Sequence, residues 1–495
     1  MIDLNAYEVW FITGSQHLYG DEVLQQVESN ARELVGHLNA QAGIEIDIQY
    51  RTVLTTQEDV VRCLMDAEHT THCIGCIAWM HTFSPAKMWI NGLMKLRKPL
   101  LHLHTQYHRD IPWKEIDMQY MNLHQSAHGD REFGFLTTRM GIPSKVVAGH
   151  WSDKELIREV GIWSKTAAAW HDSQSMKIAR FGDNMREVAV TEGDKVAAQM
   201  KFGYSVNGYG LGDLVESIQS VDEVHVTHLL EEYESSYILQ EGLNKDGMQR
   251  GNLKEAARIE IGLETFLRNG NFTAFTDTFE NLYGLTQLPG IAVQRLMQRG
   301  YGFAAEGDWK TAALVRSMKV MAAGLKGGTS FMEDYTYHLD PQQSAILGSH
   351  MLEICPSISG GPIRCEAHPL AIGGKDDPVR LIFEAAPGPA INASIVDLGD
   401  RFRLVLNQVE TIAGWEAMPA LPVAYALWKP EPDLTTAATC WLLAGGAHHT
   451  GYSSALSMSF LEDFAEMANI ECLVIDRHTN VRQLKQNMRA NASYY

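Results

Sequence analysis

The sequence lacks the features that mark secreted, membrane-bound or nucleic-acid-binding proteins. Its seven cysteines are an odd and sparse set for 495 residues, so we expect no disulfide framework. No apolar run reaches the roughly 20 residues that cross a bilayer, and the start MIDLNAYEVW has no signal-peptide pattern. Acidic residues outnumber basic ones by 60 to 41, whereas nucleic acid and anionic membranes attract positive charge. We therefore expect a cytoplasmic protein that binds neither nucleic acid nor a membrane.

Common catalytic signatures are missing as well. The chain has no Walker loop, no G-x-S-x-G and no H-E-x-x-H. Cys73 and Cys76 fit the spacing C-x-x-C, but they lie in the apolar, strand-like run CIGCIAWM. This setting favours buried thiols over a redox or metal-binding role.

The composition is that of a globular protein, with 45% apolar and 20% charged residues. At about 150 residues for each domain, the length suggests roughly three domains. The changes of pattern described below place their boundaries, and we predict domains at 1–175, 176–325 and 326–495.

The first third of the chain alternates strand and helix patterns. The segment 8–13 (EVWFIT) is a buried strand in this interpretation, and apolar residues at helical spacing follow over 23–38. Such alternation with short connections predicts a parallel sheet covered on both faces. Ligands of these sheets bind beyond the carboxyl ends of the strands, where GSQHLYG (14–20) and MHTFSP (80–85) are expected.

Two changes of pattern mark the rest of the chain. The polar segment 172–176 (DSQSM) is typical of a linker, and a second α/β stretch follows it. In that stretch Tyr301–Ala305 is a short predicted strand and Asp308 can cap the next helix. From about Lys326 strands joined by turns predict a largely antiparallel sheet or barrel. In its first strand, Phe331, Glu333, Tyr335 and Tyr337 would share one face.

Acids and histidines near strand ends are the candidate functional residues. Glu306 follows an apolar strand, and Glu333 and His350 lie within apolar runs. An unpaired buried carboxylate costs several kcal/mol, so Glu333 should be protonated, paired or bound to a metal. His448 and His449 follow two glycines, and in extended chain only one of them can face a given site. Taken singly, each residue is more readily explained as a salt-bridge glutamate or a core histidine than as a ligand.

Taken together, two carboxylates and two imidazoles form a mixed oxygen and nitrogen set that suits Mn²⁺ or a similar divalent ion. Four protein ligands on an octahedral ion leave two positions free. A substrate that chelates through two adjacent oxygens would fit there. Sequence spacing alone does not show that the four side chains meet.

The sequence resembles the L-arabinose isomerase family along nearly its whole length. Its tail KQNMRANASYY departs from the family, because it lacks an RWNE-type stretch. The matching stretches are GSQHLYG, HTFSPAKMWINGL, HGDREFGF, RFGDNMREVAVTEGDKVAAQ, AEGDWKTAAL, GGTSFMEDYTYH, LGSHMLE, IGGKDDP, DLGDRFRL and LAGGAHHT.

The resemblance implies a set of site residues. Glu306, Glu333, His350 and His449 would bind one divalent metal per subunit, usually Mn²⁺, with Co²⁺ or Mg²⁺ as substitutes. It assigns the second histidine of the pair and not His448. Contacts with the sugar are implied for Gln16, His128, Met185, Phe279, Phe331, Met351 and Ile372.

The resemblance also implies a fold, an assembly and a reaction. The fold is α/β, with a flavodoxin-like N-terminal domain, a second α/β domain and a β-rich, barrel-like C-terminal domain, as in fucose isomerase. The chain would form a homohexamer with sites at subunit junctions, where His128 serves a neighbouring subunit. The implied reaction converts L-arabinose to L-ribulose, and D-galactose to D-tagatose as a side activity. It is a metal-assisted proton transfer through a cis-enediol, with Glu306 and Glu333 as the acid/base pair.

Three other functions fit parts of the pattern. An isomerase of fucose-type sugars shares the architecture and differs in its pocket contacts. A metal-dependent hydrolase could use the same ligand types. A non-enzymatic sugar-binding protein is compatible with two α/β lobes, although the missing export signal and the buried acid and histidine set are not expected in one.

Overall fold

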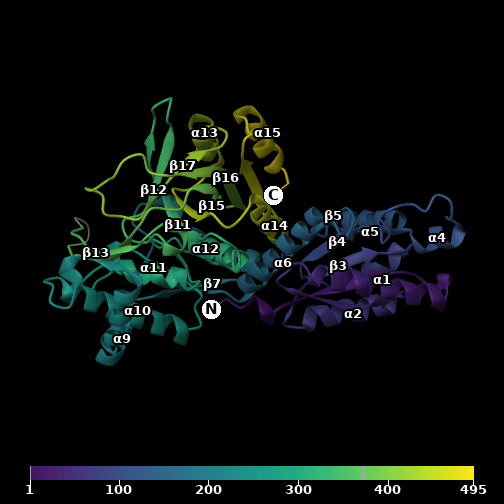
Figure 1. The fold of residues 1–495 in the computed structure, drawn as a ribbon, viewed down its shortest axis with the longest axis horizontal. Helices are drawn as coiled ribbons and strands as arrows, with labels where there is room; N and C mark the ends of the chain where they lie inside the picture. Colours follow the sequence, from purple (N-terminus) through teal and green to yellow (C-terminus); the bar gives the residue numbers. More distant parts are fainter. Residues whose placement is uncertain (1, 371–373, 495) are drawn as a thin grey trace. The chain divides into compact units, whose positions relative to one another are not determined.

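The computed structural model describes residues 2–370 and 374–494. Contacts between residues divide the chain into two compact units (Figure 1). The N-terminal unit consists of residues 2–171 and 462–469, and the C-terminal unit consists of 172–461 and the residues from 470 onward. Among the described residues, no helix has the length and apolar character needed to span a membrane.

The N-terminal unit is built on a parallel sheet with the strand order β2-β1-β3-β4-β5. This is the order of flavodoxin-like sheets, so the predicted class of this domain is confirmed. The strands are β1 (Glu8–Gly14), β2 (Asp47–Leu54), β3 (Cys73–Met80), β4 (Leu100–His104) and β5 (Ser144–Ala148). The helices are α1 (Asp21–Asn39), α2 (Gln57–His69), α3 (Ile90–Leu93), α4 (Met118–Leu123), α5 (Ser126–Met140) and α6 (Lys154–Ser175).

Helices cover both faces of this sheet, as its apolar strands require. Every residue of β3 is buried, and Cys76 lies in a core shared with α2 and α5. Neighbouring Gly75 faces the opposite side, where a Cβ atom would lie 2.9 Å from the Trp163 ring of α6. Cys73 and Cys76 are buried free thiols.

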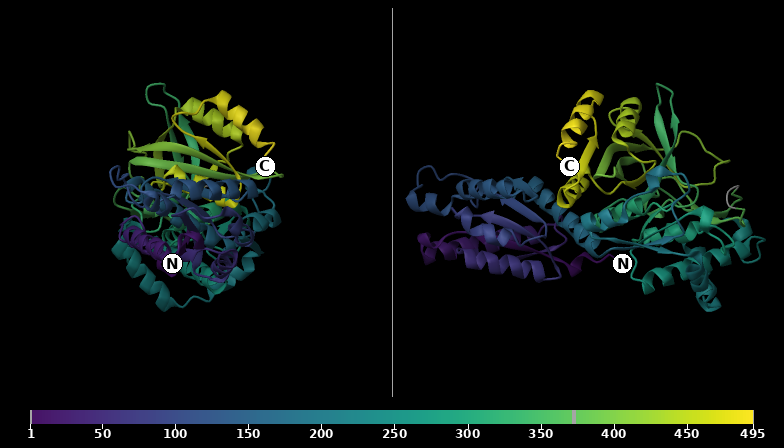
Figure 2. Two further views of the ribbon diagram at one scale, coloured as in Figure 1. Left: turned by 90° about the vertical axis from the view of Figure 1, so that its right-hand side faces the viewer. Right: turned by 180° about the vertical axis from the view of Figure 1, so that it is seen from behind.

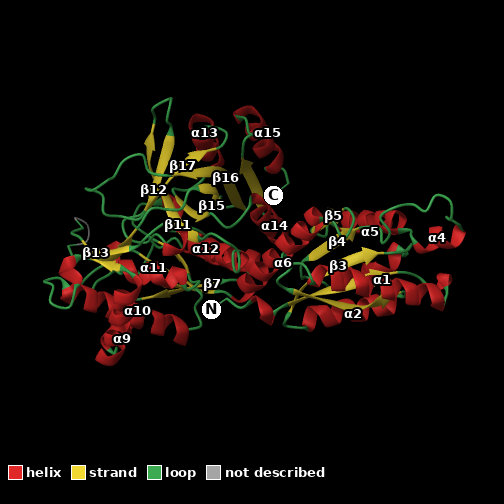
Figure 3. Cartoon of the chain, in the orientation of Figure 1, coloured by secondary structure: helices red, strands yellow, loops and turns green. Residues whose placement is uncertain are grey.

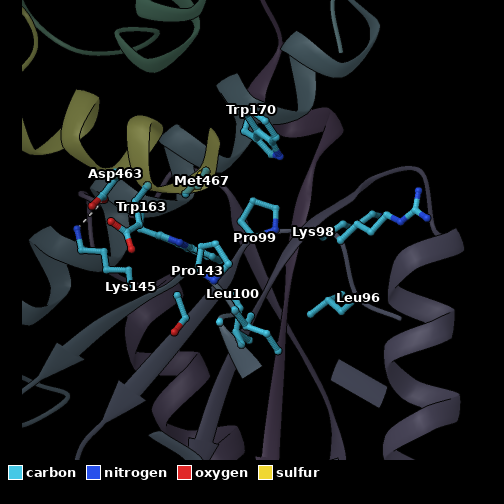
Figure 4. Close-up of a pocket in the computed structure, with 15 residues that line it drawn as sticks. Leu96, Lys98, Pro99, Leu100, Pro143, Lys145, Trp163, Trp170, Asp463 and Met467 are labelled. Atoms are coloured by element: carbon cyan, nitrogen blue, oxygen red, sulfur yellow. Dashed lines mark hydrogen bonds and ion pairs between the residues drawn. The ribbon is translucent and has the colours of Figure 1, made fainter. Parts of the chain in front are cut away.

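A pocket of about 350 Å³ lies within the N-terminal unit at the amino ends of β4 and β5. Figure 4 shows Trp163 and Trp170 of α6 on its wall, together with the ion pair between Lys145 and Asp463. Burial raises the pKa of Asp463 to about 6, although Lys145 opposes this shift. The pocket is at the sheet edge opposite to the one where α/β sheets bind ligands.

The first part of the C-terminal unit is a second parallel sheet, with the strand order β10-β9-β6-β7. Its strands are β6 (Lys177–Phe181), β7 (Ser205–Tyr209), β9 (Ala274–Asp277) and β10 (Gly302–Ala304). The helices in this part are α7 (Lys195–Phe202), α8 (Leu211–Gln219), α9 (Glu223–Ser236), α10 (Arg250–Asn269), α11 (Gly290–Gln298) and α12 (Trp309–Met321).

The prediction of a linker at 172–176 is wrong. Helix α6 continues to Ser175, and the polar residues at its end have partners in the folded chain. Asp172 pairs with Arg316 at 2.6 Å, and the buried Ser173 hydroxyl donates to the Phe202 carbonyl at 3.0 Å. Tertiary partners therefore hold as helix a segment whose composition is typical of a linker.

The second part of the C-terminal unit is a closed barrel, as the sequence predicts. Its strands pair in the order β15-β18-β11-β12-β17-β16, and β16 pairs back onto β15 and closes the ring. These strands are β11 (Thr329–His338), β12 (Ala345–Ser349), β15 (Gly388–Asp397), β16 (Phe402–Ile412), β17 (Tyr425–Pro430) and β18 (His449–Ser453).

Further elements surround the barrel. Strand β19 (Glu471–Ile475) extends β16 in parallel. Helices α13 (Leu434–Ala444) and α15 (Val481–Asn491) share an apolar cluster with β16 and β19. Both helices lie beside the barrel strands in the ribbon views of Figures 2 and 3. The remaining elements are α14 (Met458–Ala468) and a small sheet of β8 (Ile238–Leu239), β13 (Arg364–Ala367) and β14 (Val379–Ile382).

The prediction that alternate residues of 331–337 share one face is wrong beyond Glu333. The pairing of β11 with β12 shifts between Asp334 and Thr336, which is a β-bulge that breaks the alternation. As a result, Asp334 and Tyr337 lie on one side and form a hydrogen bond of 3.2 Å.

Candidate metal centre

Glu306 lies in a tight turn between β10 and α12. Its φ angle is +60° and that of Gly307 is +75°, a left-handed conformation that a residue other than glycine rarely adopts. Two hydrogen bonds hold the turn: Met185 N donates to the Glu306 carbonyl at 3.0 Å, and Gly307 N donates to the Asp277 carbonyl at 2.9 Å. Strained backbone conformations that the surrounding structure stabilises in this way are found mostly at functional sites.

Replacing Gly307 with alanine should destabilise this turn. An L side chain with positive φ costs about 1–2 kcal/mol, and the added Cβ would lie 2.6 Å from Asn184 Cα. We expect a lower midpoint of thermal unfolding, and lower activity because Glu306 and Asp308 flank the turn. Gly212→Ala is the matched control, since no atom lies within 4 Å of that Cβ. A Gly307→Ala protein as stable and active as the Gly212→Ala protein would contradict this account.

The pairing of three barrel strands brings the other candidate ligands together. Glu333 of β11 lies opposite His449 of β18 on one side. On its other side it lies opposite Ser349 of β12, the residue before His350. The cluster therefore depends on strand register, which joins residues that are far apart in the chain.

Distances within the cluster suit a small cation. Single ligand atoms of Glu306, His350 and His449 all lie within 4.8 Å of one another. His449 Nε2 is 3.8 Å from Glu306 Oε2, and His350 Nε2 is 3.9 Å from Glu333 Oε2. The Phe331 ring contacts both imidazoles, with centroid distances of 5.1 and 5.0 Å.

Two further carboxylates orient the imidazoles. Asp308 Oδ2 lies 3.2 Å from His449 Nδ1, and Glu353 forms a short hydrogen bond with His350 Nδ1. An ionised carboxylate only accepts hydrogen bonds, so in each pair Nδ1–H is the donor. In the neutral form of each ring the lone pair is then on Nε2, the atom on the side of the cluster, which is the usual arrangement of metal-binding histidines.

The environment of His449 shows whether a metal ion fits the cluster. The residue is fully buried, and among the described residues its Nε2 atom has no hydrogen-bond partner. A buried polar atom without a partner is costly. A divalent cation would satisfy this nitrogen, and the oxygen and nitrogen donors match the preferences of Mn²⁺.

Charges in the cluster favour a cation. Burial raises the pKa of Glu306, but the nearby imidazoles of His448, His449 and His350 outweigh burial, so the pKa lies below its usual value. Burial lowers the pKa of His350, whereas Glu353 and the other carboxylates raise it to about 9. The carboxylates therefore leave the cluster an excess of negative charge.

The prediction that only one of the two adjacent histidines can face the site is wrong. His448 Nε2 and His449 Nε2 each lie 3.8 Å from Glu306 Oε2. Strand β18 begins at His449, so His448 lies before it and does not follow the strand's alternation.

The residues predicted to contact the sugar fall into three groups. Met185, Phe279, Phe331 and Met351 lie in the C-terminal unit with the cluster, and Phe279 and Met351 share an apolar cluster. Gln16 and His128 lie in the N-terminal unit. The prediction for Ile372 falls outside the described residues.

Sequence reasoning missed three acidic residues. Asp308 was predicted only as a helix cap, a role that it also has, since it accepts from Thr311 N. Glu353 lies three residues after His350, and this spacing is the one signal that could have suggested a pair. Asp277 ends β9 at the sheet edge that carries Glu306.

Comparison with known proteins shows the family of the chain. The N-terminal domain of L-arabinose isomerase matches residues 3–175, its central domain 177–324 and its C-terminal domain 328–471. The L-arabinose isomerases of Herpetosiphon aurantiacus, Koribacter versatilis and Geobacillus stearothermophilus are 58%, 59% and 57% identical to the chain. Each comparison covers 100% of this chain and 99% of the relative.

The fold and the relatives define the protein as an enzyme, an isomerase that interconverts an aldose and a ketose. The chain belongs to the L-arabinose isomerase family.

Proposed function

We propose that the protein converts L-arabinose reversibly to L-ribulose, and D-galactose to D-tagatose as a side activity. The observation that carries this proposal is the convergence of Glu306, Glu333, His350 and His449, in which the buried Nε2 of His449 has no hydrogen-bond partner within residues 2–370 and 374–494. The names of the relatives support the choice of sugar.

The four side chains would hold one divalent ion in each subunit. We propose Mn²⁺, with Co²⁺ or Mg²⁺ as substitutes. When bound, the ion supplies Lewis-acid stabilisation to two adjacent oxygens of the sugar, worth several kcal/mol. Asp308 and Glu353 would keep the imidazoles in the tautomer that such an ion needs.

Glu306 and Glu333 would move the protons. An aldose–ketose conversion through a cis-enediol shifts one proton between C2 and C1 and another between O2 and O1. Two carboxylates that come from different elements, the β10–α12 turn and strand β11, can serve as base and acid. Phe331 packs against both imidazoles and would keep water away from them, which strengthens the electrostatic interactions.

We also propose a homohexamer with sites at subunit junctions. Gln16 and His128 belong to the unit that lacks the metal cluster, so they could serve a neighbouring copy. The same unit exposes large apolar side chains that a partner could cover, among them Leu18 (84% exposed) and Trp113 (79% exposed). A cytoplasmic location fits the seven free cysteines.

A panel of sugars tests the proposed function. L-arabinose, D-galactose and L-fucose are incubated with the Mn²⁺-loaded enzyme, and the ketose is measured by a colorimetric assay. We expect the highest kcat/KM with L-arabinose and a lower value with D-galactose, since one extra hydroxymethyl group is worth only about 1–3 kcal/mol of discrimination. Ketose formed fastest from L-fucose would contradict the assignment.

A further inference from the structure

Asp277 is a buried carboxylate with no hydrogen-bond or ion-pair partner among the described residues. The residue is 8% exposed, and its backbone carbonyl accepts the hydrogen bond from Gly307 N. Among residues 2–370 and 374–494, no group donates a hydrogen bond to its carboxylate or forms an ion pair with it. Burying an unpaired carboxylate is expensive, so a ligand is the expected partner.

The strand register directs this side chain. Strands β9 and β10 pair in parallel with Phe275 opposite Phe303, and side chains two residues apart in a strand share a face. Asp277 therefore points to the face of the sheet that carries Phe275 and Phe303.

That face of the sheet looks toward the metal centre. The Phe303 ring contacts the Phe331 ring, with centroids 5.9 Å apart, and Phe331 contacts the imidazoles of His350 and His449. The charges around Asp277 agree with this position. Burial and, to a smaller extent, Glu353 raise the pKa of Asp277 to about 7, although His350 opposes this shift.

The chemistry of the site selects the ligand. A carboxylate without a nearby protein donor needs a hydroxyl or amine donor from outside, and an aldose carries several hydroxyls. In the proposed reaction O1 and O2 are engaged at the reacting end. The hydroxyls beyond C2 are the donors that remain.

We propose that Asp277 is a substrate-binding residue whose carboxylate accepts a hydrogen bond from an aldose hydroxyl beyond C2. This inference rests on the proposed function and adds one residue to its substrate contacts.

The first test measures binding without turnover. L-arabinitol, an unreactive alditol with the same distal hydroxyls, is titrated by calorimetry into the Mn²⁺-loaded wild type, Asp277→Ala and Asp277→Asn. At a pH above the pKa of Asp277 we expect a loss of about 10-fold or more in affinity for Asp277→Ala, because the bond then has a charged acceptor. Asp277→Asn should lose less, since its amide oxygen still accepts. The exposed Asp213→Asn of α8 is the control and should bind as the wild type does.

The second test separates contact from structural support. Turnover of 3-, 4- and 5-deoxy-L-arabinose is compared between wild type and Asp277→Ala. At the hydroxyl that Asp277 contacts, the deoxy sugar should cost the wild type about 10-fold or more in kcat/KM and cost the variant little, as coupled partners require. Equal costs in both proteins at every position would overturn the proposal.

The outcomes also distinguish a failure of the proposal for Asp277 from a failure of the proposed function. Unchanged alditol affinity together with weaker Mn²⁺ binding in Asp277→Ala would show a role in supporting the metal, and the proposal would fail. If the wild type itself converts no L-arabinose, the proposed function fails first, whatever the variants do.

Discussion

Glu306→Gln and Glu333→Gln should each lower kcat at least ~100-fold while the protein stays folded. A positioned general acid or base typically contributes 10²–10⁴-fold, and an amide of the same shape cannot exchange the proton. The two side chains come from different elements and both lie beside the imidazoles. Turnover of L-arabinose at saturation and the midpoint of thermal unfolding are the measurements.

The control for this experiment is Glu410→Gln on the exposed side of β16, which should turn over as the wild type does. L-arabinose deuterated at C2 can then assign the roles, because its turnover reports on the step that breaks the C2–H bond. The variant that lacks the base for this proton should show the larger loss of rate in that step. Near-normal turnover in both variants would remove these glutamates from the chemistry.

Removal of divalent ions should abolish activity, and Mn²⁺ should restore it. Without a Lewis acid the barrier rises by several kcal/mol, which corresponds to at least ~100-fold in rate. Because a ligand that binds only the folded state stabilises it, Mn²⁺ should also raise the midpoint of thermal unfolding of the EDTA-treated protein. This second readout does not depend on turnover.

His449→Ala is the variant that ties this effect to the cluster. It removes the imidazole whose Nε2 has no partner among the described residues, so Mn²⁺ should stabilise it much less than it stabilises the wild type. Glu410→Gln should respond as the wild type does. Full activity in a rigorously metal-free preparation, or equal stabilisation of His449→Ala, would argue against a metal at this site.

Much of the local structure follows from the sequence. The alternation of apolar strands and amphipathic helices predicts the N-terminal parallel sheet, and the observed order β2-β1-β3-β4-β5 agrees with it. Asp308 was predicted to cap α12 and does so. These features depend on short-range preferences, so neighbouring residues suffice to predict them.

Predictions from local patterns were wrong where a residue far away in the sequence determines the structure. Residues 172–175 have the composition of a linker but continue helix α6, because Asp172 pairs with Arg316. The alternation predicted in β11 breaks at a bulge that only the pairing with β12 reveals. The alternation of side chains in a strand does not apply to His448, because β18 begins one residue after it.

The sequence by itself determined the types of residue that can bind a cation, the order of strands and helices, and the family resemblance. Only the tertiary structure decided that Glu333 lies opposite His449 and that Asp308 and Glu353 orient the two imidazoles. It also decided that Asp277 is buried with no partner in the part of the chain that the structure describes. The physical reason is that strand register is set by hydrogen bonds and core packing between segments far apart in the chain. No window of neighbouring residues contains that information.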